Sequence, residues 1–372
     1  MNNYDVILSR VIKGIRNVNE FYVIVTEDNE VFRCNQLPAS VPSITLDKMA
    51  DAFYESCRDH LTKFAASEDN KDVYAISVYT DYNHLFAFYV NTLEGLGETY
   101  KNNSDVKYDE ASFEYIFEIF NDEFELMREG YITAYHTVFD SNLGYHLPEY
   151  VGDFKDIKCA LENIIFQEQS YFIALETAKR LKEFDIEQLN TTEDFVIYAK
   201  TGQNEGLDYS LTMRQTVPLS LLYRIFPEIQ TGDEQFEQLK AEARALPLKK
   251  QIEYWLKEFN KERHGMNHNS KIVRCLKSDY EAVLALVENG VAIIPELYEE
   301  FKTAFIESDD SKESNNRIYF LNYTLGEFTL YPKEMVDDFR ALLSSEEVQK
   351  INEYTVEDIK QTFYYMQRNQ DF

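Results

Sequence analysis

Residues 73–90 read VYAISVYTDYNHLFAFYV, and this stretch decides the fold class. The runs at 73–79 and 85–90 are rich in β-branched and aromatic residues, which favour strands. The polar residues between them, Thr80 to His84, are typical of a turn. The stretch therefore predicts a β-hairpin with two largely buried strands.

Helical patterns and further strands surround this hairpin in an irregular order, which predicts an α+β fold. Thr45 can cap a helix whose apolar residues recur at intervals of three and four, as on one buried helix face. These apolar residues are Met49, Phe53, Cys57, Leu61 and Phe64. The other elements expected before residue 228 are a helix at 4–17, a hairpin at 21–34, helices at 112–129 and 156–184, a strand at 195–200, and a short helix between Pro218 and Pro227.

The C-terminal part of the chain is predicted to be mainly helical, with one small hairpin. We expect helices within 234–262 on either side of Pro247, at 278–289, 296–306, 333–343 and 355–367, and a hairpin of 317–323 with 327–331 around Gly326. A length of 372 residues suits two domains. The predicted domains are residues 1–228, an α+β domain, and residues 229–372, a mainly helical domain.

The chain is strongly acidic. It carries 37 Lys and Arg against 66 Asp and Glu, which gives a formal net charge of −29 and a pI near 4.6. Such a charge repels nucleic acids and anionic membranes, so neither is an expected partner, whereas a basic protein is. Aromatic residues make up 15% of the chain and Gly and Pro are few, which excludes disordered and low-complexity classes.

Targeting signals and cysteine usage bear on where the protein resides. The first residues, MNNYDVILSRVIKGIRNV, contain no uninterrupted apolar segment of the kind found in signal peptides, and no apolar run is long enough to cross a membrane. The four cysteines, Cys34, Cys57, Cys159 and Cys275, are widely spaced, so we expect reduced thiols. These observations predict a cytoplasmic protein.

The chain lacks the common catalytic and nucleotide-binding motifs, including the P-loop, the dinucleotide fingerprint, H-E-x-x-H and G-x-S-x-G. His264 and His268 are four residues apart with Cys275 nearby, but the intervening Gly and Asn residues favour a solvated linker over a zinc site. Cys57 and His60 share a helix face, but Cys57 belongs to the apolar stripe and is interpreted as a buried filler. We therefore predict no catalytic, cofactor-binding or metal-binding residue.

An acidic row marks the helix predicted at 112–129. Apolar residues that include Phe113, Ile116 and Phe117 would form its buried face. The expected partner-binding residues lie on the other side and are Glu110, Glu114, Glu118, Asp122, Glu125 and Glu129. Like charges four residues apart repel, so this row would invite a cationic partner. The alternative interpretation is a solvated surface that keeps the protein dissolved.

The hairpin and its surroundings resemble an uncharacterised bacterial family, the domain of unknown function numbered four-three-zero-three. The resemblance rests on Y-A-x-x-x-Y-T-D at 74–81, N-T-x-E-G at 91–95, the strand FVIYAK at 195–200 and the short helix ending in F-P at 226–227. It covers residues 45–228. The resemblance implies a compact α+β domain without assigned catalytic residues, and it associates the chain with toxin and immunity neighbourhoods.

Together these observations favour a non-enzymatic acidic module that binds a basic protein. An immunity or antitoxin-like inhibitor of a basic toxin domain is the concrete hypothesis. The first alternative is an enzyme whose pocket is assembled between the two domains. The second is a scaffold or adaptor whose helical C-terminal half binds a peptide.

Overall fold

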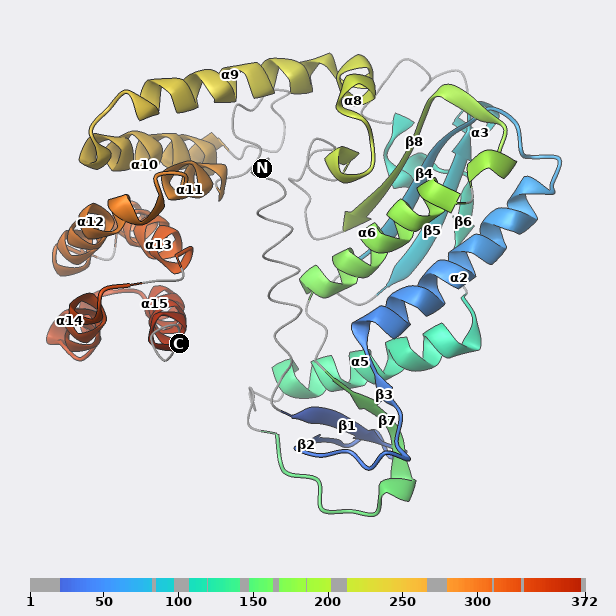
Figure 1. Cartoon of the computed structure of the whole chain (residues 1–372), viewed down its shortest axis with the longest axis horizontal. Helices are drawn as coiled ribbons and strands as arrows, with labels where there is room; N and C mark the ends of the chain where they lie inside the picture. Colours follow the sequence, from blue (N-terminus) through green and yellow to red (C-terminus); the bar gives the residue numbers. More distant parts are fainter. Residues whose placement is uncertain are drawn as a thin grey trace. The chain divides into compact units, whose positions relative to one another are not determined.

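The computed structural model describes residues 21–81, 85–96, 107–118, 120–140, 147–162, 167–184, 186–201, 213–265, 280–309, 311–328 and 331–368. The chain divides into two compact units, Met1–Pro227 and Glu228–Phe372, called here the first and the second unit. The first unit holds two four-stranded sheets with helices, and the second unit is helical (Figure 1). The predicted α+β fold class is thus confirmed. The helix predicted at 4–17 lies outside the described residues.

The sheet that we call the second sheet contains the hairpin of residues 73–90 and has the strand order β6-β5-β4-β8. Its strands are β4 (Val73–Thr80), β5 (Phe86–Thr92), β6 (Tyr115–Phe117) and β8 (Thr191–Thr201). Strands β4 and β5 pair antiparallel, so the predicted hairpin is confirmed. Strand β8 pairs parallel with β4, which makes β4 a central strand and explains why both of its faces are apolar.

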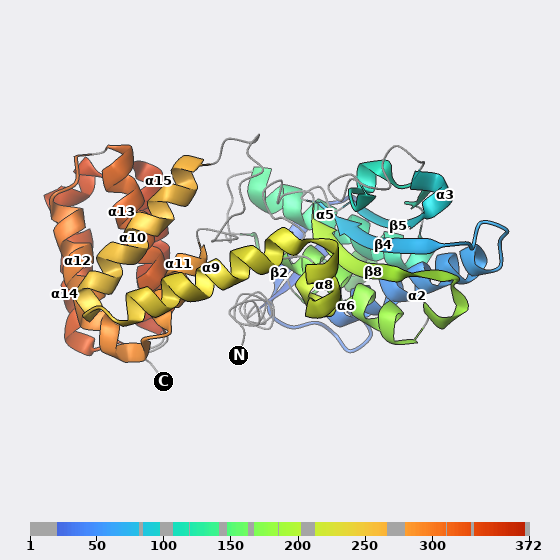
Figure 2. The same ribbon diagram turned by 90° about the horizontal axis from the view of Figure 1, so that it is seen from above.

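Helices α2 (Leu46–Ala65) and α6 (Gln167–Phe184) cover one face of the second sheet (Figure 2). The predicted cap of α2 is confirmed, because Thr45 Oγ1 accepts the backbone N–H of Lys48 at 3.1 Å. Phe53, Cys57 and Leu61 of its apolar stripe are fully buried. They share one core with the strand residues that point to the same side of the sheet, among them Ile76, Val78, Phe86, Phe88 and Ile197.

The first sheet has the order β2-β1-β7-β3 and forms a second layer of the first unit. Its strands are β1 (Tyr22–Thr26), β2 (Val31–Cys34), β3 (Ser43–Ile44) and β7 (Ile157–Leu161). The hairpin predicted at 21–34 is confirmed. The helix predicted to begin at 156 is wrong there, because 157–161 is β7, which pairs with β1 and β3, and α6 begins at Gln167. Ile157 and Leu161 are four residues apart, a spacing that places two residues on one side of either a helix or a strand.

Helix α5 (Asp122–Asp140) joins the two layers, because it packs both on α2 and on strands β1 and β7 of the first sheet. Gly130 makes this approach possible. A Cβ at that position would lie 2.5 Å from Sγ of Cys159 on β7. Any larger residue at 130 would therefore push α5 away from the first sheet.

On the other face of the second sheet, residues 107–112, which contain the short helix η1 (Glu110–Ser112), lie over β4 and β8. Two buried tyrosines hold this segment in place. Tyr74 Oη donates to the carbonyl of Lys107, and Tyr198 Oη donates to the carbonyl of Tyr108, both at 2.6 Å. Asn91 Nδ2 donates to the carbonyl of Ser112 at 3.0 Å. The segment leads directly into β6, so these bonds also position the edge strand.

The remaining short elements of the first unit are α3 (Leu93–Leu96), η2 (Phe154–Asp156), η3 (Ile186–Gln188), η4 (Met213–Gln215) and α8 (Leu219–Ile225).

The second unit consists of helices packed around one core. They are α9 (Pro227–Arg244), α10 (Leu248–Gly265), α11 (Tyr280–Val287), η5 (Gly290–Ile293), α12 (Ile294–Ile306), α13 (Lys312–Gly326), α14 (Lys333–Leu343), η6 (Glu346–Lys350) and α15 (Glu353–Arg368). The break near Pro247 and the helices expected further along are confirmed. The core includes Trp255, Phe259 and Phe301.

The small hairpin predicted around Gly326 is wrong, because residues 317–323 lie within α13. Ser311 caps this helix, with its Oγ accepting the N–H of Ser314 at 3.2 Å. Ile318, Leu321 and Leu325 then fall at intervals of three and four and are fully buried. Packing against α12 and α15 stabilises the helix in spite of its many aromatic and polar residues.

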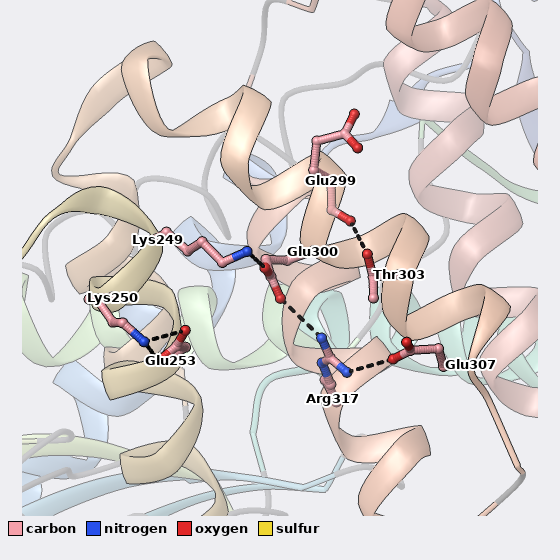
Figure 3. A network of polar contacts seen from close by, with 8 residues as sticks. All are labelled: Lys249, Lys250, Glu253, Glu299, Glu300, Thr303, Glu307 and Arg317. Carbon is pink, nitrogen blue, oxygen red and sulfur yellow. Dashed lines mark hydrogen bonds and ion pairs between the residues drawn. The ribbon is translucent and has the colours of Figure 1, made fainter.

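An ion-pair network joins three helices of the second unit (Figure 3). The Glu300 carboxylate of α12 accepts hydrogen bonds from Lys249 Nζ of α10 at 2.8 Å and from Arg317 Nη2 of α13 at 3.0 Å. Arg317 also pairs with Glu307 at 3.7 Å. Only 16% of the Glu300 side chain is exposed. The hydrogen bonds from Lys249 and Arg317 hold the pKa of Glu300 below its usual value, against the opposing effect of burial.

We expect Glu300→Gln to destabilise the second unit by about 1–3 kcal/mol at neutral pH, because Lys249 and Arg317 lose their shared charged acceptor. A carboxyl with a lowered folded pKa contributes stability that is complete above its unfolded pKa and lost as the pH falls through the folded pKa. The variant should therefore lose less stability than the wild type when the pH is lowered below the usual Glu value of 4.5. Urea unfolding followed by the fluorescence of Trp255, the only tryptophan, measures this unit.

Glu299→Gln is the matched control, because Glu299 lies on the same helix and pairs with Lys302 while 68% exposed. It should cost less than about 1 kcal/mol. Equal pH dependence of Glu300→Gln and the wild type would show that the network does not couple protonation to folding.

Candidate functional site

The residues predicted to bind a partner do not lie on one helix. The helix predicted at 112–129 is confirmed only for residues 122–129 and is wrong before them, because residues 115–117 form strand β6 and α5 begins only at Asp122. The pattern that indicates the strand is an alternation of the aromatic residues Phe113, Tyr115 and Phe117 with Glu114 and Glu118, interrupted only by Ile116. A period of two was thus present in the sequence and was overlooked in favour of the four-residue spacing of the carboxylates.

Asn121 marks the start of α5. Its Oδ1 accepts the N–H of Phe124 at 2.8 Å, which is the geometry of a helix N-cap. The backbone N–H of Asn121 donates to Ser56 Oγ of α2 at 3.2 Å. The cap therefore both begins the helix and attaches its first turn to α2.

Strand β6 has one packed and one open face. Tyr115 and Phe117 point toward the core, where their rings lie 5.0 Å from Phe64 and 5.8 Å from Phe88. Ile116 points the other way and is 50% exposed, although the sequence predicted that it would be buried. Because side chains alternate along a strand, the exposed Glu114 and Glu118 lie on the same side as Ile116.

Two of the six predicted carboxylates are neutralised within the protein. Glu125 pairs with Arg128 of the same helix at 2.6 Å, and Glu129 pairs with Lys158 of β7 at 3.2 Å. Both pairs reduce the attraction that these carboxylates would exert on an external cation. The backbone of Glu110 lies in η1, and its side chain is outside the described set.

The other three carboxylates, Glu114, Glu118 and Asp122, are exposed and make no ion pair with any lysine or arginine in the described part of the chain. We call these three residues the acidic edge. Glu114 and Glu118 flank β6, and Asp122 opens the first turn of α5. A carboxylate at a helix N-terminus is favourable, so Asp122 is compatible with the helix on which it lies.

The negative potential at this edge affects a neighbouring residue. The pKa of Tyr115 is raised to about 12, first by burial and then by the carboxylates of Glu114, Asp69 and Glu94. Glu114 lies against Gly95 of α3, where a Cβ would meet its carboxylate. Its backbone N–H donates to Asn91 Oδ1 of β5 at 3.3 Å. The strand and the helix α3 thus place several negative charges around one end of β6.

The described residues bear on two of the sites considered from the sequence, a metal site and a nucleophilic Cys57. No group of three or more His, Cys, Asp or Glu residues there could hold a metal ion. The side chain of His264, together with His268 and Cys275, lies outside the described residues. Cys57 is buried as predicted, and burial raises the pKa of its thiol well above the usual value. A thiol in that state is a poor nucleophile.

The described cysteines and helices bear on the predicted reduced thiols and on the predicted lack of a membrane-spanning segment. Cys34, Cys57 and Cys159 are free and buried, as expected of reduced thiols. Within the described helices, none combines the length and the apolar character that crossing a bilayer requires.

Comparison with known proteins adds no relative to these observations. No protein-family model matches the chain, and no match was found among the curated proteins or the solved structures. The resemblance to the domain of unknown function numbered four-three-zero-three therefore stays a prediction, and the function must be inferred from the acidic edge itself.

Proposed function

We propose that this chain is a non-enzymatic module that binds a basic protein through the acidic edge. The observation that supports this most directly is that Glu114 and Glu118 are exposed on the same side of β6 as Ile116 and, like Asp122 at the start of α5, are unpaired among the described residues. An exposed apolar side chain between two unpaired charges of one sign is a suitable centre for an interface with a complementary protein. The more specific role, an immunity or antitoxin-like inhibitor of a basic toxin domain, rests on the family resemblance.

Electrostatics would act mainly on the rate of association. A protein with a net charge of −29 attracts a cationic partner over a distance of about one Debye length, roughly 8 Å at physiological salt. Unpaired carboxylates at one place convert this general attraction into a preferred orientation. The exposed Ile116 would then contribute apolar burial, which slows dissociation.

A short lysine-rich peptide tests this proposal on the chain of 372 residues. We expect the triple variant Glu114→Gln, Glu118→Gln, Asp122→Asn to bind octalysine about tenfold more weakly than the wild type at low salt, because three unpaired charges are lost. The difference should shrink as the salt concentration rises. Fluorescence anisotropy of a labelled peptide measures both effects, and circular dichroism verifies that the variant is folded.

A second triple variant controls for net charge. Glu27, Asp28 and Glu30 lie in the exposed turn between β1 and β2 and make no ion pair with a described residue. Replacing them with Gln, Asn and Gln removes the same charge from the first sheet. This control should change the affinity less than about twofold if binding is local. If both triple variants lose the same affinity, the attraction is a property of the whole chain and the acidic edge is not the binding site.

A further inference from the structure

Strand β6 lies at an edge of the second sheet, because the order is β6-β5-β4-β8 and only β5 pairs with it. Its partners across the ladder are Phe88, Tyr89 and Val90. Within the described residues, no backbone or side-chain group on the other side hydrogen-bonds to the main chain of 115–117. Alternate residues of such a strand direct their N–H and C=O groups away from the neighbouring strand. Either Ile116, or both Tyr115 and Phe117, therefore present free backbone groups.

The edge strand β2 of the first sheet is different, because the chain itself covers it. The N–H of Arg33 donates to the carbonyl of Pro148 at 2.9 Å, and the N–H of Tyr150 donates to the carbonyl of Arg33 at 2.8 Å. Glu149 forms a parallel bridge with Arg33. At β2 the fold thus pairs a sheet edge internally, and no described segment does the same for β6.

We infer that β6 binds an extended segment of a basic protein as an added strand. This inference rests on the proposed function and specifies how the basic partner is recognised. Residues directly opposite each other in neighbouring strands have Cβ atoms about 5 Å apart. The segment would therefore carry Lys or Arg opposite Glu114 and Glu118, with an apolar residue between them opposite Ile116. The recognised pattern is a basic residue, any residue, an apolar residue, any residue and a second basic residue.

Charge argues against a second copy of this chain as the added strand. Antiparallel pairing of two β6 strands about Ile116 would place Glu114 of each copy opposite Glu118 of the other. Like charges directly opposite each other destabilise a strand pair. The same carboxylates that exclude self-association favour a basic strand.

The main chain also argues against a basic helix as the occupant. A helix satisfies its backbone groups internally and could use only the carboxylates and Ile116. An added strand also pairs with the free N–H and C=O groups of β6. Strand addition thus uses Glu114, Glu118, Ile116 and the free backbone groups of β6 together.

Three peptides test the mode of binding. The first is Ac-Gly-Thr-Lys-Thr-Val-Thr-Lys-Thr-Gly-NH2, which alternates as the edge requires. The other two are N-methylated derivatives, one at both Thr residues that flank Val and the other at Val and both Lys residues. Because only alternate residues of an added strand face β6, one derivative should bind about tenfold more weakly than the parent and the other within about twofold.

Hydrogen exchange supplies a second readout that needs no variant. Binding of the parent peptide should slow exchange of the outward-facing backbone amides of 115–117 and leave the turn at 27–30 unchanged.

Two further affinities test the side-chain contacts. A permuted peptide of the same composition with the two Lys residues adjacent should bind about fivefold more weakly. Ile116→Ala should weaken binding of the parent peptide by about threefold, through lost apolar contact.

The outcomes separate this inference from the proposed function. If the triple variant at the acidic edge weakens binding but both N-methylated peptides bind like the parent, a basic partner binds there in another conformation and strand addition is refuted. If the triple variant and its control bind the parent peptide equally well, the proposed function itself fails. A tenfold loss with both N-methylation patterns would also contradict strand addition, because alternation is its signature.

Discussion

Replacing Phe53 with Ala should lower the free energy of unfolding of the first unit by about 3–5 kcal/mol. Phe53 is fully buried on α2, and its ring lies 4.9 Å from Phe86 of β5, 4.8 Å from Phe120 and 4.9 Å from Phe124 of α5. The substitution would leave a cavity at the point where these elements meet. Aromatic pairs contribute about 0.5–1.5 kcal/mol each beyond area burial, so the loss should fall near the top of the range.

The effect bears on the acidic edge, because Phe120 and Phe124 fix the chain between β6 and the first turn of α5. Urea unfolding followed by far-ultraviolet circular dichroism measures the stability. Val151→Ala is the matched control, since Val151 is 93% exposed in the same unit and its truncation should cost less than about 0.5 kcal/mol. Phe53→Leu keeps most of the volume and should recover part of the loss if the alanine variant does not fold. A loss below about 1 kcal/mol for Phe53→Ala would mean that this aromatic cluster is not the centre of the core.

Replacing Phe301 with Ala should destabilise the second unit by a similar amount, about 3–5 kcal/mol. Phe301 of α12 is fully buried. Its ring stacks on Phe339 of α14 at 5.1 Å with an interplanar angle of 12°, and it lies 5.9 Å from Phe305. Phe339 continues the stack to Phe363 of α15 at 5.5 Å. Truncating Phe301 would therefore remove one end of a stack that connects three helices.

Trp255 gives a direct measurement of this second effect, because it is the only tryptophan and is buried in the same core. Tyr354→Ala serves as the control, since Tyr354 is 83% exposed on α15 and should contribute less than about 0.5 kcal/mol. The midpoint of the fluorescence transition in urea should fall clearly for Phe301→Ala and hardly move for the control. If the two variants behaved alike, the stacked rings would not determine the stability of this unit.

Several elements could be predicted from the sequence because their signals are local. Helix α2 has a capping residue, Thr45, and one apolar face, and both lie within a single window. The hairpin β4–β5 consists of two strand-like runs joined by a polar turn. Helix α14 begins after Pro332, where a proline suits a helix start. In each case the residues that form the element also specify its boundaries.

The errors share one physical cause. Strand β7 was predicted as part of a helix because Ile157 and Leu161 match the helical spacing of the apolar residues that follow, and what makes it a strand is hydrogen bonding to β1 and β3, far away in the chain. Residues 317–323 were predicted as a strand because they are rich in aromatic residues, but neighbouring helices bury Ile318 and Leu321 along one side. Tertiary contacts outweighed local propensity at both places.

The acidic edge shows the same division. Its carboxylates and its excess of negative charge were visible in the sequence, and so was the interpretation that they bind a cation. The sequence could not indicate that Lys158 would neutralise Glu129, because that pair forms only when β7 lies beside α5. It also could not indicate that Ile116 would be exposed, because this depends on which face of β6 the rest of the folded chain covers.

By itself, then, the amino-acid sequence determined the α+β class, the capped helix α2, the central hairpin and the acidic character of the chain. Only the tertiary structure decided which carboxylates remain unpaired and that two of them, Glu114 and Glu118, flank an edge strand instead of following a helix. The reason is that charge and periodicity are properties of neighbouring residues, whereas the pairing of a strand and the neutralisation of a charge depend on groups brought together by folding.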